Sequence, residues 1–176
     1  MPKKLKKNSI GILGGTFDPP HYGHIGISKI AIKKLMLKNV FWVVTRQNPL
    51  KSKPDLSLNT RIQLCKIILK KNKKIKIKNI GKKFNFLNTF DLLNYFKKKN
   101  KKKKIYFLMG ADNIINFHKW KKWKKIPSLA KIVIFARPGF TKKSIKSLAL
   151  KRLNRQNWIY INDAKFDISS TKLKNI

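Results

Sequence analysis

Residues 14–24, with the sequence Gly-Gly-Thr-Phe-Asp-Pro-Pro-His-Tyr-Gly-His, decide the fold of this chain of 176 residues. They follow a short apolar run, Ile10–Leu13, which is typical of a buried strand in a parallel sheet. Apolar side chains then recur near helical spacing in residues 25–35. We therefore predict a strand-to-helix loop at the carboxyl end of a first strand, where open α/β sheets bind their ligands.

The residue types in this loop suit a polyphosphate ligand. Gly14 and Gly15 carry no Cβ, so backbone N–H groups can approach a ligand closely. The helix that begins near Gly23 directs free N–H groups and the positive end of its dipole at the loop. His21 and His24 straddle the helix start and can donate hydrogen bonds to phosphoryl oxygens. The alternative interpretation is an ordinary glycine turn with a capping aspartate and two solvated histidines.

The net charge of the chain is extreme, because Lys and Arg total 44 whereas Asp and Glu total 6. One interpretation is a nucleic-acid-binding protein. The other is a compositional bias toward Lys, Asn and Ile, as AT-rich codons produce. Only five of the 44 basic residues are Arg, the residue best suited to bidentate phosphate and base contacts. Because the lysines also run through every segment, we favour the bias.

Length and cysteine content set further bounds. A chain of 176 residues is predicted to form a single domain over residues 1–176, with a basic, flexible N-terminus at residues 1–8 and a C-terminal helix that is short or absent. No apolar run is long enough to span a bilayer. The single cysteine, Cys65, excludes an internal disulfide and is expected to be a buried structural thiol. These features predict a cytoplasmic protein without a membrane partner.

The remaining pattern predicts a Rossmann-like α/β fold, doubly wound, with a mostly parallel sheet of five to six strands and helices on both faces. Further strands are expected at residues 40–44, 75–77, 105–109, 131–136 and 158–161. Helices are expected from Thr60 to residue 69, at 88–96 and at 144–153. The lysine run at residues 97–104 is expected to be a mobile loop.

Three polar positions follow predicted strands at the ligand-binding edge. Lys51 lies in the loop after the second strand, where a solvated lysine is the alternative role. Asp112 follows the central strand and either accepts hydrogen bonds from ribose or substrate groups or caps a helix. Arg137 begins an Arg-Pro-Gly turn and either faces a nucleotide phosphate or anchors that turn.

Residues 14–24 resemble the signature of the H-x-G-H nucleotidyltransferase superfamily, and more narrowly that of the nicotinate-nucleotide adenylyltransferases of bacterial NAD synthesis. Phosphopantetheine adenylyltransferases usually carry Thr where this chain has His21. Residues 168–174, Ile-Ser-Ser-Thr-Lys-Leu-Lys, resemble the second superfamily signature, Ile-Ser-Ser-Thr-x-Ile-Arg. Lys174 replaces the usual Arg there, which keeps the charge and loses the bidentate fork.

The resemblance implies a role for each matching residue. The catalytic residues are then His21 and His24. The ATP-binding residues are Gly14, Gly15, Thr16, Phe17, Lys51, Asp112, Ser169, Ser170, Thr171 and Lys174. The mononucleotide-binding residues are Asn48, Phe86, Thr89, Trp120 and Arg137, although the first Thr of the family's Tyr-Thr-x-x-Thr-Leu stretch is missing near Phe86. Mg²⁺ arrives with ATP as cofactor, and Asp18 is the nearest candidate for an outer ligand.

The resemblance also implies the reaction: AMP passes from ATP to nicotinate mononucleotide, which gives deamido-NAD and pyrophosphate. The implied partners are ATP and nicotinate mononucleotide, and no nucleic acid. A phosphopantetheine adenylyltransferase or a cytidylyltransferase remains an alternative within the class. A basic nucleic-acid-binding protein and a catalytically inactive relative are alternatives outside it. The sequence leaves the oligomeric state and the choice between nicotinate and nicotinamide mononucleotide open.

Overall fold

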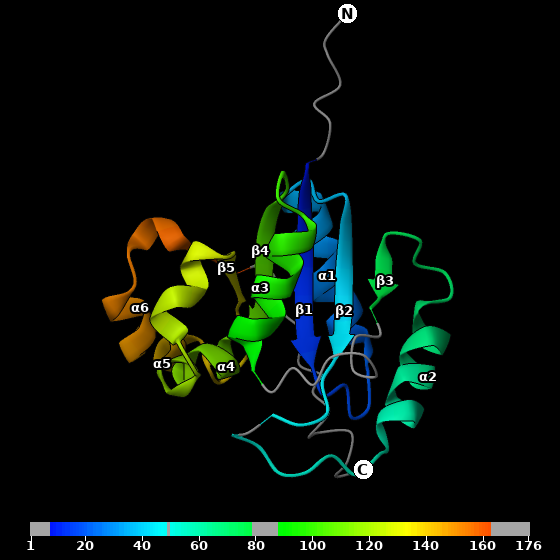
Figure 1. Cartoon of the computed structure of the whole chain (residues 1–176). Helices are drawn as coiled ribbons and strands as arrows, with labels where there is room; N and C mark the ends of the chain where they lie inside the picture. Colours follow the sequence, from blue (N-terminus) through cyan, green and yellow to red (C-terminus); the bar gives the residue numbers. More distant parts are fainter. Residues whose placement is uncertain (1–7, 49, 79–87, 163–176) are drawn as a thin grey trace, which may run out of the picture.

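A parallel six-stranded sheet forms the centre of the computed structural model, which describes residues 8–48, 50–78 and 88–162 (Figure 1). The strands lie in the order β3-β2-β1-β4-β5-β6, and every neighbouring pair is parallel. They are β1 (Ser9–Gly15), β2 (Asn39–Val44), β3 (Ile75–Ile77), β4 (Lys104–Gly110), β5 (Lys131–Phe135) and β6 (Trp158–Ile161). The predicted parallel α/β sheet is confirmed, with six strands and no antiparallel pair among the described residues.

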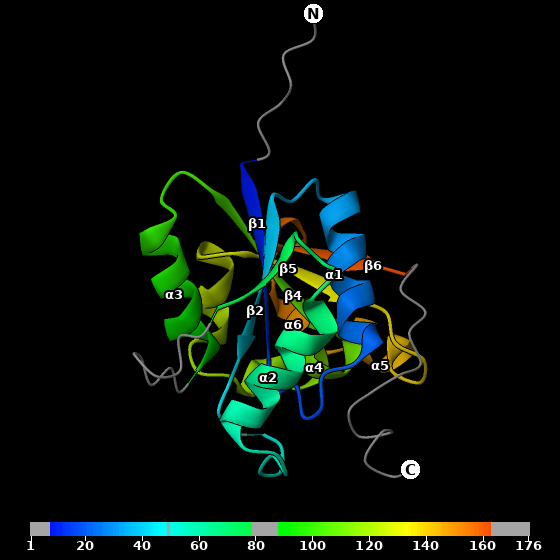
Figure 2. The same ribbon diagram turned by 90° about the vertical axis from the view of Figure 1, so that its right-hand side faces the viewer.

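Helices cover both faces of this sheet (Figure 2). The α-helices are α1 (Tyr22–Lys34), α2 (Leu58–Leu69), α3 (Thr89–Lys99), α4 (Ala111–Ile115), α5 (Thr141–Ile145) and α6 (Leu148–Arg152). The 3₁₀ turns are η1 (Phe117–Lys119), η2 (Trp123–Ser128) and η3 (Arg155–Asn157). None of the helices within the described ranges is long and apolar enough to cross a membrane.

Alternating side chains on each strand build two hydrophobic cores. On β1, Ile10 and Ile12 point into the core that contains α3, α4 and α6, whereas Leu13 joins the core that contains α1 and α2. Successive strand residues point to opposite faces, so a strand buried on both sides reads as a continuous apolar run. Cys65 is fully buried in the second core, and burial raises the pKa of its thiol to about 12. The expected structural role of this cysteine agrees with that environment.

The strand order reverses between β1 and β4. β2 and β3 lie on one side of β1, and β4, β5 and β6 follow on the other. The connections after β1 and β4 therefore leave on opposite sides and open a crevice at the carboxyl edge of the sheet, which is where doubly wound folds bind ligands. Residues 14–24 begin at this point of the sheet.

Two helix predictions were wrong in detail. The residue that caps α2 is Ser57 and not Thr60, because the Ser57 Oγ accepts the backbone N–H of Thr60 at 3.1 Å. The single helix expected over residues 144–153 is two short helices, α5 and α6. Ser147 interrupts them: its backbone is extended, and its Oγ accepts the N–H of Leu150 at 3.4 Å as the cap of α6. Serine competes for backbone hydrogen bonds in this way and favours caps over helix interiors.

The lysine run at residues 97–104 is also more ordered than we expected. Its first three residues complete α3, where positive charge suits the helix carboxyl end, and Lys104 begins β4. The turn between them is held by Asn100, whose Nδ2 donates to the carbonyl of Phe96 at 3.0 Å. Asn8, placed in the flexible N-terminus, donates from its side chain to the Lys102 carbonyl at 2.7 Å. Residues 1–7 lie outside the described ranges.

Candidate active site

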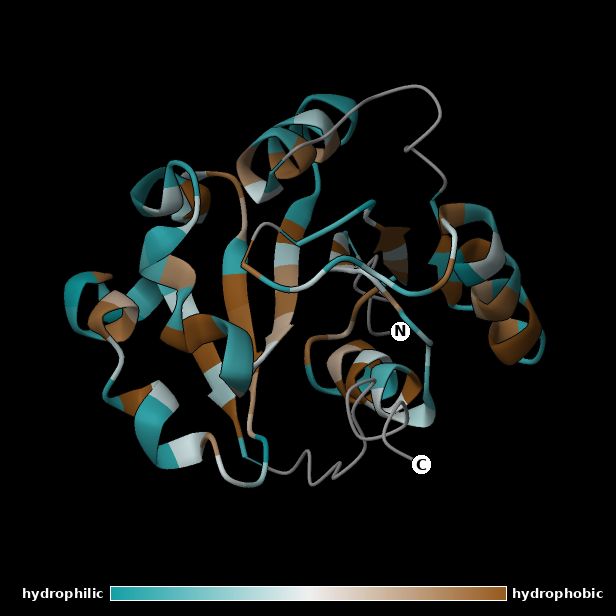
Figure 3. Ribbon diagram, turned by 90° about the horizontal axis from the view of Figure 1, so that it is seen from below, coloured by the Kyte–Doolittle hydropathy of each residue, from teal (hydrophilic) through white to brown (hydrophobic). Residues whose placement is uncertain are grey.

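The loop after β1 and the start of α4 after β4 meet at the carboxyl edge of the sheet. Figure 3 looks onto this edge, where mostly hydrophilic connections surround the hydrophobic strands. Backbone hydrogen bonding extends past the strand ends, because the N–H of Thr45 donates to the carbonyl of Gly15 at 2.8 Å. The loops after β1 and β2 are thus joined directly at the point where the strands end.

His21 and His24 lie against each other at the start of α1. His21 is the N-cap residue with an extended backbone, and its N–H donates to the Nδ1 of His24 at 3.2 Å. The centroids of the two imidazole rings are 3.8 Å apart. The ring of Phe17 lies 4.7 Å from that of His24, so one side of the pair is apolar. The predicted juxtaposition of the two histidines with a helix amino end is therefore present.

Both imidazoles are neutral at pH 7. Burial, followed by the positive charge of Arg137, lowers the pKa of His21 to about 4. Burial also holds the pKa of His24 well below its usual 6.5, with further lowering by His21 and Arg137. A neutral imidazole has one N–H donor and one acceptor nitrogen. Since the Nδ1 of His24 accepts a hydrogen bond, its proton resides on Nε2, and His24 offers an N–H donor to a ligand.

The His21 side chain also takes part in the cap of α1. It faces the backbone N–H of His24 in a capping box, but within the described ranges its buried Nδ1 makes no hydrogen bond of good geometry. Buried polar atoms in folded proteins are nearly always hydrogen-bonded. The His21 ring nitrogen therefore retains hydrogen-bonding capacity beside a helix amino end.

The rings of Phe17 and Trp42 pack against His24. Phe17 adopts a left-handed backbone, with φ of 50°, which is uncommon for a residue other than glycine and concentrates at functional sites. Its buried ring stacks on Trp42 at a centroid distance of 4.8 Å. The Trp42 Nε1 donates to the Ser28 Oγ at 2.8 Å, and that hydroxyl donates to the His24 carbonyl at 2.8 Å. Strand β2 thereby determines where the first turn of α1 lies.

Three charged side chains gather beside the histidines. The Asp112 Oδ2 lies 3.0 Å from an Arg137 guanidinium nitrogen and 3.7 Å from the Lys51 Nζ. Asp112 is in the first turn of α4, whose N-cap is Gly110, so the alternative role of helix cap does not apply. A Cβ on Gly110 would lie 2.6 Å from the Asp112 Oδ1, so any other residue at this position would make the Asp112 carboxylate move.

The residues expected at the mononucleotide end are placed as follows. The Asn48 Oδ1 accepts the N–H of Leu50 at 2.9 Å, which fixes the turn that leads to Lys51. Thr89 is the first residue of α3. Trp120 is half-buried, and its ring lies 6.2 Å from the ring of Phe107 on β4. The expected residues Phe86, Ser169, Ser170, Thr171 and Lys174 lie outside the described ranges.

Asp18, the candidate outer ligand of Mg²⁺, makes hydrogen bonds to backbone groups. It is buried, and its two carboxylate oxygens accept the backbone N–H groups of Asp55 at 2.8 Å and Leu56 at 3.0 Å. Across the described ranges no three His, Cys, Asp or Glu side chains cluster as a metal-binding group. Asp18 therefore connects the loop after β1 to the loop after β2.

Sequence reasoning missed Arg61, which is 2% exposed and lies behind the same loops. Its guanidinium donates to backbone carbonyls of both loops, including that of Thr16. A signal was available, because arginine is rare in this lysine-rich chain and Arg61 shares the inner face of its helix with Ile62 and Cys65. Position on a helix face shows burial but does not show which carbonyls a guanidinium reaches.

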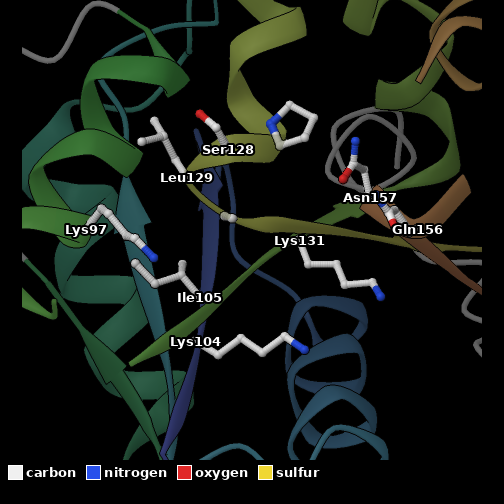
Figure 4. A pocket seen from close by; sticks show the side chains of 10 residues that line it. Lys97, Lys104, Ile105, Ser128, Leu129, Lys131, Gln156 and Asn157 are labelled. Carbon is white, nitrogen blue, oxygen red and sulfur yellow. The ribbon is translucent and has the colours of Figure 1, made fainter. Parts of the chain in front are cut away.

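A separate hollow lies at the opposite edge of the sheet (Figure 4). Lys104 and Lys131, at the amino ends of β4 and β5, line it together with Lys97. Parallel strands place their amino ends away from the edge that carries the histidines. This hollow is therefore no part of the candidate active site.

The chain is similar to known proteins over nearly its whole length. A model of the cytidylyltransferase-like family matches residues 12–176. A protein of Pelagibacter ubique named "Probable nicotinate-nucleotide adenylyltransferase" is 48% identical over 97% of this chain and 94% of its own length. A protein of Agrobacterium fabrum with the same name is 32% identical over 94% of this chain and 97% of its own length.

Solved structures share the fold. The nicotinic acid mononucleotide adenylyltransferase of Plasmodium falciparum, complexed with NaAD, aligns with a TM-score of 0.79 at 24% identity. That alignment covers 96% of this chain and 83% of the other. A structure from Vibrio parahaemolyticus aligns with a TM-score of 0.67 at 18% identity, over 96% of this chain and 85% of the other.

Proposed function

The chain belongs to the nicotinate-nucleotide adenylyltransferases, within the cytidylyltransferase-like family, and we propose on this premise how its site works. It transfers AMP from ATP to nicotinate mononucleotide in NAD biosynthesis, which gives deamido-NAD and pyrophosphate. The observation that carries the proposed mechanism is the neutral pair of His21 and His24 at the amino end of α1, at the point where the strand order reverses.

The reaction needs positioning and charge stabilisation more than proton transfer. The nucleophile is the phosphate of the mononucleotide, which is largely dianionic at pH 7 because the second pKa of a phosphate monoester is about 6. No general base is required, in agreement with a chain that has no glutamate. In our proposal the His24 Nε2–H donates to an α-phosphate oxygen, and His21 orients the ATP phosphates. A neutral donor in a partly dry site stabilises developing charge without reorganisation.

Cationic groups lie close to the two histidines, where we place the ATP phosphates. Lys51 and Arg137 together carry two positive charges, of which Asp112 offsets one. The amino end of α1 adds a partial positive charge and free N–H groups. We assign Lys51 and the backbone of Gly14, Gly15, Thr16 and Phe17 to the ATP phosphates. The proposed phosphate ligands Ser169, Ser170, Thr171 and Lys174 belong to the part of the chain that the structure leaves undescribed.

The mononucleotide is assigned to the side of the sheet that carries α3. Phe90 and Trp120 both pack against the core on this face, and the Lys122 Nζ lies 4.9 Å from the Phe90 ring centroid. Thr89 and Trp120 are therefore on one side of the sheet, which supports a shared role at the pyridine and ribose. Aromatic stacking suits a flat heterocycle. Asn48, Phe86 and Arg137 complete the proposed set at this end.

We propose that Mg²⁺ enters with ATP and is held mainly by the phosphates and water, as this cation commonly is. Asp18 stays the candidate outer ligand, through the lone pairs that its two backbone hydrogen bonds leave on its oxygens. We expect most of the oxygen donors to come from the nucleotide and water. We further propose that residues 1–176 act as one domain and that the protein works in the cytoplasm, where Cys65 remains a thiol.

Pyrophosphate release tests this function. The purified protein is incubated with Mg-ATP and, in parallel, nicotinate mononucleotide, nicotinamide mononucleotide or phosphopantetheine. Release with nicotinate mononucleotide is expected. Release with phosphopantetheine alone would overturn the proposed acceptor. No release with any acceptor, combined with tight and steeply salt-dependent binding of DNA or RNA, would favour a nucleic-acid-binding protein.

The catalytic role of His24 is tested by His24→Ala. Removal of one preorganised donor is expected to lower kcat by about 100- to 1,000-fold. His118→Ala is the matched control, since His118 lies in η1 and has no role in the proposed site. Circular dichroism checks that both variants are folded. A folded His24→Ala variant with normal turnover would refute the role.

A further inference from the structure

Arg61 donates four hydrogen bonds to backbone carbonyls. The acceptors lie in the loop after β1 and in the loop that joins β2 to α2. The Arg61 Nε donates to Leu56 at 3.0 Å, one terminal nitrogen donates to Thr16 at 2.5 Å and to Thr45 at 2.7 Å, and the other donates to Arg46 at 3.1 Å. A guanidinium has five N–H donors in a rigid fork, so this set uses nearly all of them.

Asp18 completes the connection from the other side. It belongs to the loop after β1, and its carboxylate accepts the N–H groups of Asp55 and Leu56. The backbone of Leu56 is therefore held on both sides of its Cα, by Asp18 at the N–H and by Arg61 at the carbonyl. The charge of Asp18 also favours the protonated guanidinium, which opposes the effect of burial. We call Asp18 and Arg61 together the loop clamp.

The loop clamp acts on the segments that carry the candidate site. One side holds Thr16, five residues before His21 in the same loop. The other side holds Thr45 and Arg46, which begin the loop that carries Lys51. None of these hydrogen bonds joins one strand to another or one helix to another; each ends on the backbone of a loop. These bonds instead fix the separation of two ligand-binding loops.

We propose that Arg61 and Asp18 are positioning residues for AMP transfer. They hold the loop after β1 and the loop after β2 at the separation at which the histidines and Lys51 bind ATP together. This inference rests on the proposed function. It assigns to the two residues no contact with substrate, and it explains why an arginine is needed here in a chain whose basic residues are mostly lysine. A lysine ammonium has three N–H donors on one atom and cannot reach four carbonyls spread over both loops.

Three variants test the proposal. Arg61→Lys keeps the charge and removes the fork. Asp18→Asn keeps the size and removes one acceptor oxygen, and it serves if Arg61→Lys does not fold. Ile62→Ala is the matched control, because Ile62 is a buried core residue next to Arg61 on the same helix and its side chain has no group that can hydrogen-bond to the loops. It is expected to lower thermal stability while kcat and the KM for ATP stay near their wild-type values.

Enzyme kinetics give the first readout. Arg61→Lys is expected to lower kcat/KM for ATP by about 100-fold, because small displacements of positioning groups cost that much. Lys51→Ala is then introduced into each background. In the Arg61→Lys background its effect on kcat/KM is expected to be smaller than in the wild type, since Lys51 is already displaced. In the Ile62→Ala background its effect is expected to be undiminished. Additive effects of Arg61→Lys and Lys51→Ala would overturn the proposal.

Hydrogen exchange gives a readout that needs no activity. The amides of Asp55 and Leu56 are expected to exchange slowly in the wild type and faster in Arg61→Lys and Asp18→Asn, but not in Ile62→Ala. Unchanged exchange at both amides in the two clamp variants would refute the loop clamp. If the wild type released no pyrophosphate but showed this exchange pattern, the proposed function would fail while the loop clamp stood.

Discussion

Acidification should destabilise this protein through its paired histidines. His21 is 9% exposed, and burial followed by the charge of Arg137 lowers its pKa from 6.5 to about 4. The unfolded chain therefore binds a proton at His21 more readily than the folded protein does. The stabilising contribution of neutral His21 is complete above pH 6.5, declines as the pH falls, and is lost once the pH passes below about 4.

The size of this effect follows from the same values. A difference between 6.5 and about 4 corresponds to about 3 kcal/mol of unfolding free energy, at about 1.4 kcal/mol for each pH unit. That is a large part of the roughly 5–15 kcal/mol that stabilises an ordinary domain. The lowered pKa of His24 acts in the same direction. We therefore expect most of the acid sensitivity between pH 6.5 and 4 to originate in this pair.

Urea denaturation at a series of pH values measures the effect, with His21→Gln as the comparison because glutamine does not titrate. The unfolding free energy of the wild type should fall by about 3 kcal/mol more than that of the variant between pH 7 and 4. NMR titration of the three histidine rings gives the pKa values directly. If the unfolding free energies of the two proteins changed equally with pH, or if the pKa of His21 were near 6.5, the histidine pair would not be held neutral.

Two further substitutions test other parts of the site and fold. Gly110→Ala would place a Cβ 2.6 Å from the Asp112 Oδ1 and displace that carboxylate from Arg137. The kcat/KM of the folded variant should therefore fall by about tenfold or more. Unchanged kinetics would contradict the assigned geometry. Ser57→Ala removes the acceptor for the Thr60 N–H, so it should lower the unfolding free energy by about 1 kcal/mol and leave kcat unchanged. Thermal denaturation measures the loss, and an unchanged melting temperature would contradict the role of Ser57 as the cap.

Several features of the fold and the site could be predicted from short stretches of sequence. Apolar runs such as Ile10–Leu13 predicted buried parallel strands, because both faces of such a strand must be apolar. The lysine run at residues 97–104 misled us. Its composition predicts a solvated loop, but α3 and β4 extend into it because they are stabilised by packing at their other residues.

The sequence alone determined the class of fold, the presence of a strand-to-helix loop within residues 14–24 and the position of His21 and His24 at the start of the helix, since these depend on spacing within a few residues. Only the tertiary structure decided that both histidines are neutral, that Asp112 pairs with Arg137, and that Arg61 joins two loops. Burial and contacts between residues far apart in the chain depend on how helices and strands pack. A guanidinium finds its carbonyls only after that packing has brought separate loops to the same edge of the sheet.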